Sequence, residues 1–337
     1  MFQQILHKIK KIRQQKAVIL MYHQVCERGN DPWELAVHPD HFYDQLEYLK
    51  KNFNVIPVEE LAGGIAANKM PDHAVALTFD DGFKDNYTTA APLLDWYELP
   101  ATFYVSTRHL AEEQTYWWDA LEEVLFRTEV LPASFELMIN GELVTFDLGA
   151  NHVLQKKASH QIRAWNYHLP IANERIALYM ILWSKLKTFC YDEQTRVVAR
   201  IREWAGLRGP ASGYGAPMSV REIQMLSENP LFSVGAHTVH HSMLAQHNAK
   251  EQEFEVRESK KQIEQWLKKP VTGFSYPYGN FNGTTREILR DTGFQYAVST
   301  ESKIATREAD VFALPRIQVK NWSVYEFALN LKEMVYE

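Results

Sequence analysis

Two adjacent carboxylates, Asp80 and Asp81, end an apolar run and stand directly before a glycine in the stretch LTFDDG. Consecutive side chains of a strand point to opposite faces, so two neighbouring acids would normally serve two different environments. If the strand ends at Phe79, Gly82 permits a sharp turn that brings both carboxylates into one cavity. One acid could then bind a metal ion while the other stays free as a base.

Two histidines, His237 and His241, stand four residues apart in the stretch HTVHH, directly after the strand-like run FSVGA. On a helical turn this spacing would place both imidazoles on one face, and His240 off that face at the surface. Alone, such a pair is a weak signal that more often marks a surface or core feature. Two imidazoles and one carboxylate, however, form a common ligand set for a catalytic divalent metal with an open position for water or substrate.

The elements that must position these residues alternate between strands and helices. Strands are predicted over 17–22, 74–79 and 101–106, with helical periodicity over 39–53 and in the stretch up to Trp96. Strand-like runs return at 232–237, 296–300 and 313–319, and the stretch 272–280 is a predicted strand with a turn. Capping boxes at Ser219–Glu222 and Thr284–Glu287 mark two helix starts. This alternation predicts a parallel sheet, either open or closed into a barrel.

The alternation breaks from about residue 112 to residue 215. There the stretch FELMINGELVTF places Asn140–Gly141 between two strand-like runs, which predicts a two-residue hairpin, and helical stretches flank it. The loop GLRGPASGYGAP, rich in glycine and proline, ends the segment. We therefore divide the chain into an N-terminal amphipathic helix over 1–16, a barrel over 17–111 and 216–337, and an α+β insertion over 112–215.

The composition, with 46% hydrophobic and 23% charged residues, is that of a soluble globular protein. A net charge of -6 argues against a nucleic-acid partner, because no basic excess is available to neutralise phosphates. Two cysteines, Cys26 and Cys190, form no disulfide framework in a chain of this size, which favours a reducing compartment. The apolar run 17–22 is too short for a signal peptide or membrane span, so we expect a cytoplasmic protein.

Residues 1–16 carry Ile5, Leu6, Ile9 and Ile12 on one helical face and lysines elsewhere. That pattern suits peripheral contact with the inner membrane face, and equally a solvated helix that packs on the body of the protein.

The stretches TFDDG, HTVHH and SYPYG occur in the order and spacing of the polysaccharide deacetylases of the NodB homology type, also called carbohydrate esterase family 4. The chain resembles this family over most of its length outside the insertion. The resemblance implies a distorted (β/α) barrel and metal-dependent hydrolysis of an N- or O-acetyl group. It implies that Asp80 is the catalytic base, that Asp81, His237 and His241 bind the metal, and that the backbone N–H of Tyr278 holds the oxyanion. It suggests Zn²⁺, although Co²⁺, Ni²⁺ and Fe²⁺ also suit these ligands.

One departure from the family pattern concerns the proton donor. Many members carry a histidine at the end of a late apolar run, to protonate the leaving amine, but this chain has no histidine after His247. The run ILMYH at 19–23 has the same form at the other end of the chain, and a closed barrel makes its first and last strands neighbours. We therefore predict that His23 is the general acid; the alternative is that it caps a buried strand and hydrogen-bonds locally.

A second departure is the serine at position 275, where many relatives carry an arginine that orients the catalytic carboxylate. We expect Arg316 to reach the site from another strand and supply that charge, with an exposed salt bridge as the alternative.

These observations predict a metal-dependent hydrolase that removes an acetyl group from an N-acetylated sugar of a glycan or glycan precursor by cleaving a linear amide C–N bond. The alternatives are a non-catalytic carbohydrate-binding barrel and a hydrolase of a non-sugar amide. The insertion is predicted to be a lid or specificity element, because it departs from the barrel just after the end of the strand 101–106. Loops at such strand ends are where barrels vary their substrate choice. Trp117 and Trp118 open it and could stack on a sugar, although packing in the core is favoured.

Overall fold

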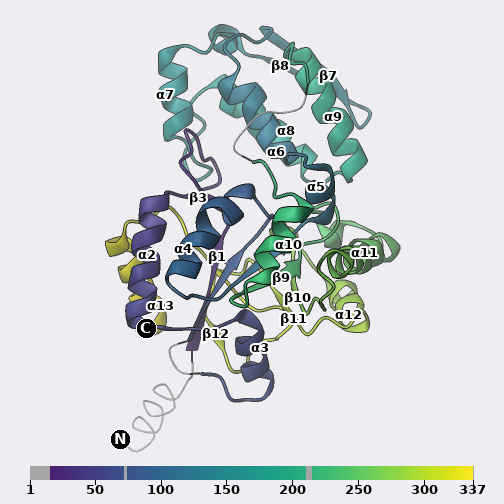
Figure 1. Ribbon diagram of the computed structural model, residues 1–337. Helices are drawn as coiled ribbons and strands as arrows, with labels where there is room; N and C mark the ends of the chain where they lie inside the picture. Colours follow the sequence, from purple (N-terminus) through teal and green to yellow (C-terminus); the bar gives the residue numbers. More distant parts are fainter. Residues whose placement is uncertain (1–15, 72–73, 210–214, 337) are drawn as a thin grey trace, which may run out of the picture. The chain divides into compact units, whose positions relative to one another are not determined.

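The computed structural model describes residues 16–71, 74–209 and 215–336, so the predicted N-terminal helix lies outside the described residues except for Lys16. The chain divides into two compact units (Figure 1). Unit 1 comprises the residues up to Glu27, Leu35–Leu110 and the residues from Met218 onward, and unit 2 comprises Arg28–Glu34 and Ala111–Pro217. The chain therefore passes into unit 2 twice, once for a short segment and once for a long one.

Unit 1 is built on a mainly parallel sheet whose strands follow the order β11-β10-β9-β6-β5-β1. These strands are β1 (Lys16–Tyr22), β5 (Ala74–Phe79), β6 (Ala101–Val105), β9 (Phe232–Ala236), β10 (Gly273–Ser275) and β11 (Tyr296–Val298). Short strands extend it: β13 (Ile317–Gln318) is parallel to β1, β12 (Ala305–Thr306) is antiparallel to β1, and β4 (Asn54–Val55) is parallel to β5. A parallel bridge between Val298 and Leu314 brings the chain from β11 round towards β13, so the sheet curls back towards its first strand.

The central strands β1 and β5 are apolar and buried along almost their whole length, as expected for parallel strands covered on both faces. They pair from Ala17 and Ala74 to Tyr22 and Phe79, and the amide of Asp80 donates to the carbonyl of Tyr22 at 3.0 Å. The next residues in the chain, His23 and Asp80, therefore leave two neighbouring strands at the same edge of the sheet.

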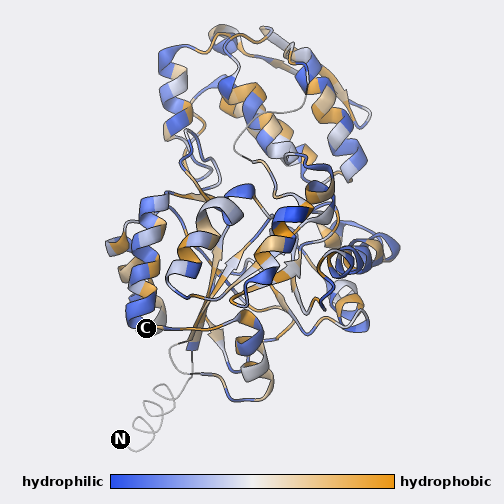
Figure 2. Cartoon of the chain, in the orientation of Figure 1, coloured by the Kyte–Doolittle hydropathy of each residue, from blue (hydrophilic) through white to orange (hydrophobic). Residues whose placement is uncertain are grey.

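The helices of unit 1 are α2 (Pro39–Asn52), α3 (Val58–Ala66), α4 (Ala91–Trp96), α10 (Val220–Glu228), α11 (Ala249–Leu267), α12 (Gly283–Asp291) and α13 (Val324–Tyr336). Short helical turns are η1 (Asn86–Ala90), η4 (Leu244–Gln246) and η5 (Pro277–Gly279), and α5 (Thr107–Glu112) leads into unit 2. A parallel pair, β2 (Gln24–Val25) and β3 (Ala36–Val37), stands apart from the main sheet. Helix α11 is mostly hydrophilic (Figure 2), and even its buried face carries polar residues beside Val256 and Ile263.

The two predicted capping boxes have different outcomes. The box at Ser219 and Glu222 opens α10 and is confirmed. The second prediction is wrong, because α12 begins two residues earlier and its reciprocal pair is Asn282 and Thr285. The side-chain oxygen of Asn282 accepts from the amide of Thr285, so the asparagine takes the cap in preference to the threonine that follows.

Unit 2 contains a hairpin of β7 (Ser134–Ile139) and β8 (Glu142–Asp147), and its helices are α6 (Trp117–Glu122), η2 (Glu123–Arg127), η3 (Gly149–His152), α7 (Lys156–Ala164), α8 (Glu174–Leu186) and α9 (Tyr191–Trp204). The hairpin prediction is confirmed, since Asn140 and Gly141 both have positive φ, 51° and 79°, as the two-residue turn requires. Trp117 and Trp118 are buried, in agreement with the favoured core interpretation.

The short segment 28–34 is held within unit 2 by its own side chains. The Trp33 ring stacks on Tyr167 and Trp183, with centroids 5.2 and 4.1 Å apart, and its Nε1 donates to the Tyr179 hydroxyl at 2.7 Å. Arg28 and Asn30 both donate to Glu122 of α6, at 2.7 and 2.8 Å. A segment that begins three residues after the end of β2 therefore belongs to the other unit.

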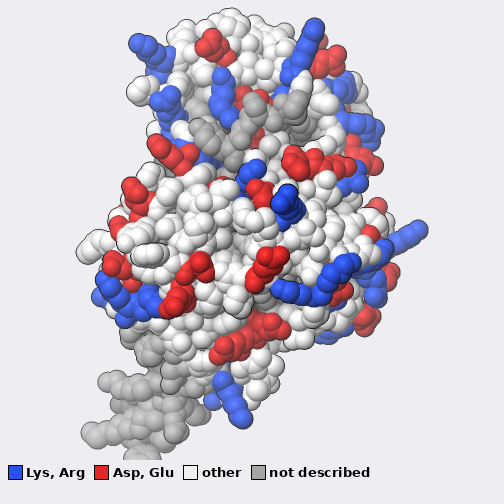
Figure 3. Space-filling model, viewed as in Figure 1, with Lys and Arg blue, Asp and Glu red and all other residues white. Residues whose placement is uncertain are grey.

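Acidic and basic side chains are interspersed on the visible face of each unit (Figure 3). Within the described ranges, every helix is too short or too polar to cross a bilayer.

Candidate active site

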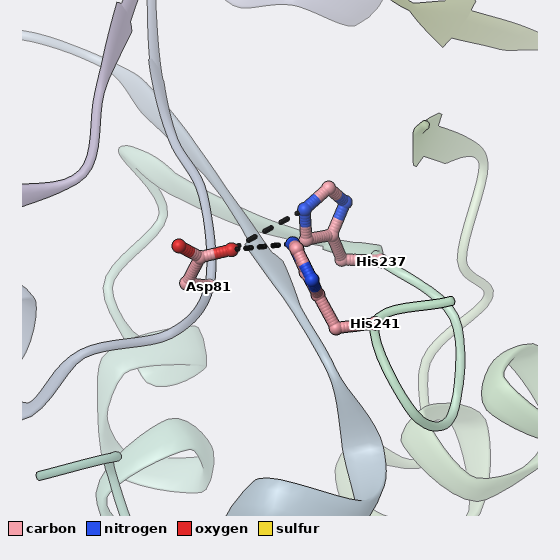
Figure 4. A group of neighbouring side chains, drawn as sticks. All are labelled: Asp81, His237 and His241. Carbon is pink, nitrogen blue, oxygen red and sulfur yellow. Dashed lines mark ion pairs between the residues drawn. The ribbon is translucent and has the colours of Figure 1, made fainter. Parts of the chain in front are cut away.

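Asp81, His237 and His241 converge on one point at the carboxyl ends of β5 and β9 (Figure 4). The Nε2 atoms of His237 and His241 lie 3.4 and 3.2 Å from Asp81 Oδ1, and one ligand atom from each residue lies within 4.8 Å of the others. All three side chains are buried. One carboxylate oxygen and two imidazole nitrogens, clustered and shielded from water, fit the donor set of a divalent metal such as zinc.

The local backbone after β5 places both acids in the site. Asp81 and Gly82 adopt left-handed conformations, with φ of 72° and 70°, so the chain turns sharply as soon as the strand ends. Aspartate is one of the few residues that tolerates the left-handed region of backbone conformation. At position 82 a glycine is also required because there is no room for a side chain. A Cβ at Gly82 would lie 2.9 Å from Val105 Cγ1. The turn inferred from the TFDDG stretch is therefore present, although it begins at Asp81 itself.

The segment that carries the two histidines is an irregular loop, so the predicted helical turn is wrong. Thr238 and His241 have φ of 67° and 57°, a left-handed conformation that α-helices exclude. The two imidazole rings are in contact although the backbone is not helical, since the ring centroids of His237 and His241 lie 4.9 Å apart. The His237 Nδ1 lies 2.8 Å from the carbonyl of Ser275, which fixes the ring and leaves Nε2 directed towards Asp81.

Glu255 on α11 holds this histidine loop, and no local sequence pattern marks it as part of the site. Its Oε2 accepts from the amides of Val239 and His240 at 2.9 and 3.0 Å, and its Oε1 lies 2.6 Å from His240 Nδ1. Burial opposes ionisation of Glu255, but the bonds from His240 and Val239 outweigh it and lower the pKa of the carboxyl. His240 was predicted to be a surface residue, and it is instead half-buried in this pair.

Asp80 is bound separately from the three-residue cluster. Arg316 donates to Asp80 in bidentate fashion, from one terminal nitrogen to Oδ1 at 2.8 Å and from the other to Oδ2 at 2.6 Å. The hydroxyl of Ser275 donates to Oδ2 at 3.1 Å. Burial by itself raises the pKa of Asp80, yet the charge of Arg316 and the bonds it donates outweigh that effect and lower it. The carboxylate is therefore kept ionised beside the cluster.

Arg316 is fully buried and directly precedes β13, the strand that pairs with β1. Its remaining donors contact the carbonyl of Ser299 at 2.8 Å, the hydroxyl of Thr78 at 3.1 Å and the hydroxyl of Ser275 at 2.9 Å. The alternative of an exposed salt bridge is thus excluded. A guanidinium reaches the carboxylate from another strand, and Ser275 contributes a hydroxyl to the same cluster.

His23 leaves β1 beside Asp80 and is partly exposed. Burial of its ring lowers the pKa of His23, while the nearby carboxylates of Asp81 and Asp80 act in the opposite direction. Its Nδ1 atom is buried and has no hydrogen-bond partner among the described residues. The local hydrogen bond of the alternative interpretation is therefore not seen for Nδ1, and the role of His23 as an acid stays a prediction.

Tyr278 lies in the turn η5 with φ of 56° and ψ of 12°. Its ring meets the His241 ring edge-on, with centroids 4.7 Å apart. The structure therefore gathers the predicted site residues at one edge of the sheet, although the oxyanion role of the Tyr278 amide stays a prediction.

Comparison with known proteins gives a family and a fold. A family model described as polysaccharide deacetylase matches residues 67–130 and 201–297. The putative polysaccharide deacetylase YxkH of Bacillus subtilis is 22% identical over 319 residues, which cover 92% of this chain and 74% of that protein. A poly-beta-1,6-N-acetyl-D-glucosamine N-deacetylase of Staphylococcus aureus is 25% identical over 126 residues, 34% of this chain and 43% of that one.

Two solved structures resemble this chain over nearly its full length. The Streptococcus pyogenes deacetylase PplD in complex with acetate has a TM-score of 0.59 at 20% identity and covers 96% of this chain and 99% of its own. IcaB from Ammonifex degensii has a TM-score of 0.58 at 18% identity, and the match covers 94% of this chain and 96% of IcaB. These likenesses confirm the predicted distorted α/β barrel, here a curled half-barrel sheet. The TFDDG, HTVHH and SYPYG stretches all lie within the matched residues, and the chain belongs to the polysaccharide deacetylase family.

Proposed function

We propose that the protein is a metal-dependent hydrolase that removes the acetyl group from an N-acetylated sugar of a glycan or glycan precursor. The observation that carries this proposal is the separation of two carboxylates: Asp81 faces two imidazoles, while Asp80 is held by Arg316. A barrel that only binds carbohydrate has no use for a second buried carboxylate with its own arginine. Catalysis does, because an ionised base must stay free beside the metal ligands.

Asp81, His237 and His241 would hold the ion, for which Zn²⁺ is the first candidate and Co²⁺, Ni²⁺ and Fe²⁺ are alternatives. When bound, such an ion polarises a carbonyl and lowers the pKa of a water molecule. Burial lowers the pKa of His241, which favours the neutral imidazole that a metal requires.

The residues of the chain supply the remaining chemistry. Asp80 accepts a proton from the water that attacks the acetyl carbonyl carbon, and Arg316 and Ser275 hold it in the orientation to do so. The amide of Tyr278 stabilises the oxyanion that develops on the carbonyl oxygen. His23 donates a proton to the nitrogen as the C–N bond breaks, so the products are acetate and a free amine on the sugar.

Poly-N-acetylglucosamine is the first substrate class to test, because relatives with detectable identity are named as N-deacetylases of that polymer. We assign unit 2 to substrate selection. The chain enters it at Ala111, near the end of α5, which follows β6. On its return the amide of Met218 donates to the carbonyl of Gly82 at 2.9 Å. The chain thus joins unit 1 next to the Asp80–Asp81 turn. The cytoplasmic location and the contact of residues 1–16 with the inner membrane face stay predictions.

Acetate release from the metal-loaded protein tests the proposal. The panel holds β-1,6-linked N-acetylglucosamine oligomers, acetylated sugar nucleotides, lipid-linked N-acetylated sugars and cyclic amides, with Asp80→Asn as the inactive control. We expect release from at least one acetylated sugar and almost none from the control. Release from cyclic amides alone would favour a non-sugar amidase, and glycan binding without any release would favour a binding barrel.

A further inference from the structure

Two side chains outside the metal cluster hold the chain at the carbonyl of His23 and at the two residues that follow it. Asn86 Nδ2 donates to the carbonyl oxygen of His23 at 2.7 Å. Asp85 Oδ1 accepts from the amide of Val25 at 2.9 Å, and its Oδ2 accepts from Gln24 Nε2 at 3.3 Å. Asn86 Nδ2 also donates to Asp85 Oδ1 at 3.0 Å, which links the two side chains to each other.

The main sheet does not hold this part of the chain. The last pair of β1 with β5 is Tyr22 with Phe79, and the Asp80 amide makes the final bond, to the Tyr22 carbonyl. After His23 the chain passes into the short β2–β3 pair and then enters unit 2 at Arg28. His23 therefore stands between a strand end and a segment that belongs to another unit. The bonds from Asn86 and Asp85, which we call the anchor, act within this interval, between the last β1–β5 pair and Arg28.

The anchor belongs to the same stretch of chain as the catalytic acids. Asn86 opens the π-helical turn η1, four residues after Gly82, and its side chain is fully buried. Single π-turns of this kind often occur at functional sites. Asn86 Oδ1 has no hydrogen-bond partner among the described residues, and a buried polar atom left in that state opposes stability. The bonds that its Nδ2 donates to the His23 carbonyl and to Asp85 account for an asparagine at this buried position.

We propose that Asp85 and Asn86 are positioning residues for the proton donor: they fix the main chain at His23 so that its imidazole stays beside Asp80. This inference rests on the proposed function, in which His23 protonates the leaving amine. The stretch DDGFKDN then has two tasks, since its first two residues supply a base and a ligand, and its last two hold the acid in place.

The test compares two substrates that differ in the need for a proton. An acetylated sugar amide needs protonation of its nitrogen, whereas an activated aryl acetate has a leaving group that departs without it. We expect Asn86→Ala to lower kcat on the amide by about 10- to 100-fold, the scale of a small misplacement of a catalytic group, with KM and metal content little changed. Turnover of the aryl acetate should fall less than about threefold, and Asp85→Ala should show the same selectivity.

Three further measurements make the inference specific to His23. The double variant His23→Ala/Asn86→Ala should be no slower than His23→Ala alone, because an anchor has no effect once its imidazole is absent. Asp85→Asn keeps an acceptor oxygen and should recover much of the loss seen in Asp85→Ala. In metal-free protein, the His23 ring resonances should shift in Asn86→Ala. Thr88→Ala is the matched control, since Thr88 is exposed in the same turn and bonds only Lys84 in the described structure.

Equal losses on amide and aryl acetate, loss of metal, or a loss that adds to that of His23→Ala would each overturn the inference. If Asn86→Ala does not fold, the partly exposed Asp85 provides the deciding variants through Asp85→Ala and its rescue by Asp85→Asn. Absence of acetate release from the unaltered protein would refute the proposed function itself. Normal activity with a selective His23→Ala defect, but none in the Asp85 and Asn86 variants, would refute only the anchor.

Discussion

Each unit of the molecule buries an arginine completely, and the two arginines have different partners. In unit 1, Arg316 donates to the carboxylate of Asp80 beside the metal-binding cluster. In unit 2, Arg175 donates to main-chain carbonyls, those of Leu125, Thr128, Glu129, Asn151 and His152. The first arginine keeps a reactive group ionised, and the second joins η2, η3 and α8 into one body.

The buried acids differ in the same way. Glu122 of unit 2 accepts from Arg28 and Asn30 and so ties the segment 28–34 to α6. Asp80 and Asp81 of unit 1 lie at strand ends on a left-handed turn, next to two imidazoles. Burial of charge is therefore not enough to mark a reactive site. What distinguishes unit 1 is that its buried groups converge on one point with donor atoms directed towards it.

The largest expected effect is removal of a metal ligand. His241→Ala should lose metal and acetate release together, because two remaining donors cannot complete the set that a borderline divalent ion requires. Elemental analysis and activity are measured on the same sample, with His247→Ala, a histidine outside the cluster, as the control. A fully metallated His241→Ala protein would remove His241 from the ligand set.

Asp80→Asn should keep the metal and lose turnover by on the order of 10² to 10⁴, since the amide preserves shape but cannot accept the proton. Arg316 would then face a neutral group, so a moderate loss of stability should accompany the change. Unaltered kcat in this variant would mean that a different residue is the base.

Arg175→Met should lower the free energy of unfolding by about 3 kcal/mol, because several buried carbonyls lose their donor at once. Metal affinity should stay unchanged, since the arginine has a role only inside unit 2. Chemical denaturation and metal titration of the same variant measure both quantities. If the variant also loses metal affinity, then metal binding in unit 1 depends on Arg175 in unit 2.

Glu255→Gln should weaken metal binding by about 10- to 100-fold, the range typical of residues that support a ligand from behind. The amide keeps one acceptor for the Val239 and His240 amides but loses the ionised partner of His240. Glu258→Gln on the same helix is the matched control, because that glutamate contacts Lys261 and Gln262 instead. Equal affinity of both variants would refute the supporting role.

The smallest expected effect concerns pH and unit 2. Burial, together with the charge of Asp119, outweighs the attraction of Arg28 and raises the pKa of Glu122 to about 8. The folded state then keeps a proton that the unfolded state releases at its ordinary, lower pKa, so stability falls as pH rises between those two values. Thermal unfolding should show this slope in the unaltered protein and a flatter one in Glu122→Gln. A slope that is unchanged in the variant would assign the proton elsewhere.

Features that depend on contiguous residues could be predicted from the sequence. The hairpin at Asn140–Gly141 follows from two residues that both tolerate positive φ, and β1 and β5 follow from unbroken apolar runs. The histidine pair was recognised, but its backbone was not. Thr238 and His241 adopt left-handed conformations that cannot be predicted from their residue types. Glu255 of α11 supports this loop through a tertiary contact. The joining of 28–34 to unit 2 likewise depends on stacking partners more than a hundred residues away.

By itself, the sequence determined which chemical groups the chain possesses: the paired acids of TFDDG, the two histidines of HTVHH and a spare arginine at 316. Only the tertiary structure decided how they combine. The bond from Arg316 to Asp80 joins residues 236 positions apart, and His23 lies beside Asp80 only because β1 pairs with β5 in one register. Residue types and local conformation are properties of neighbouring positions, whereas these distances result from strand pairing and burial, which no local stretch specifies.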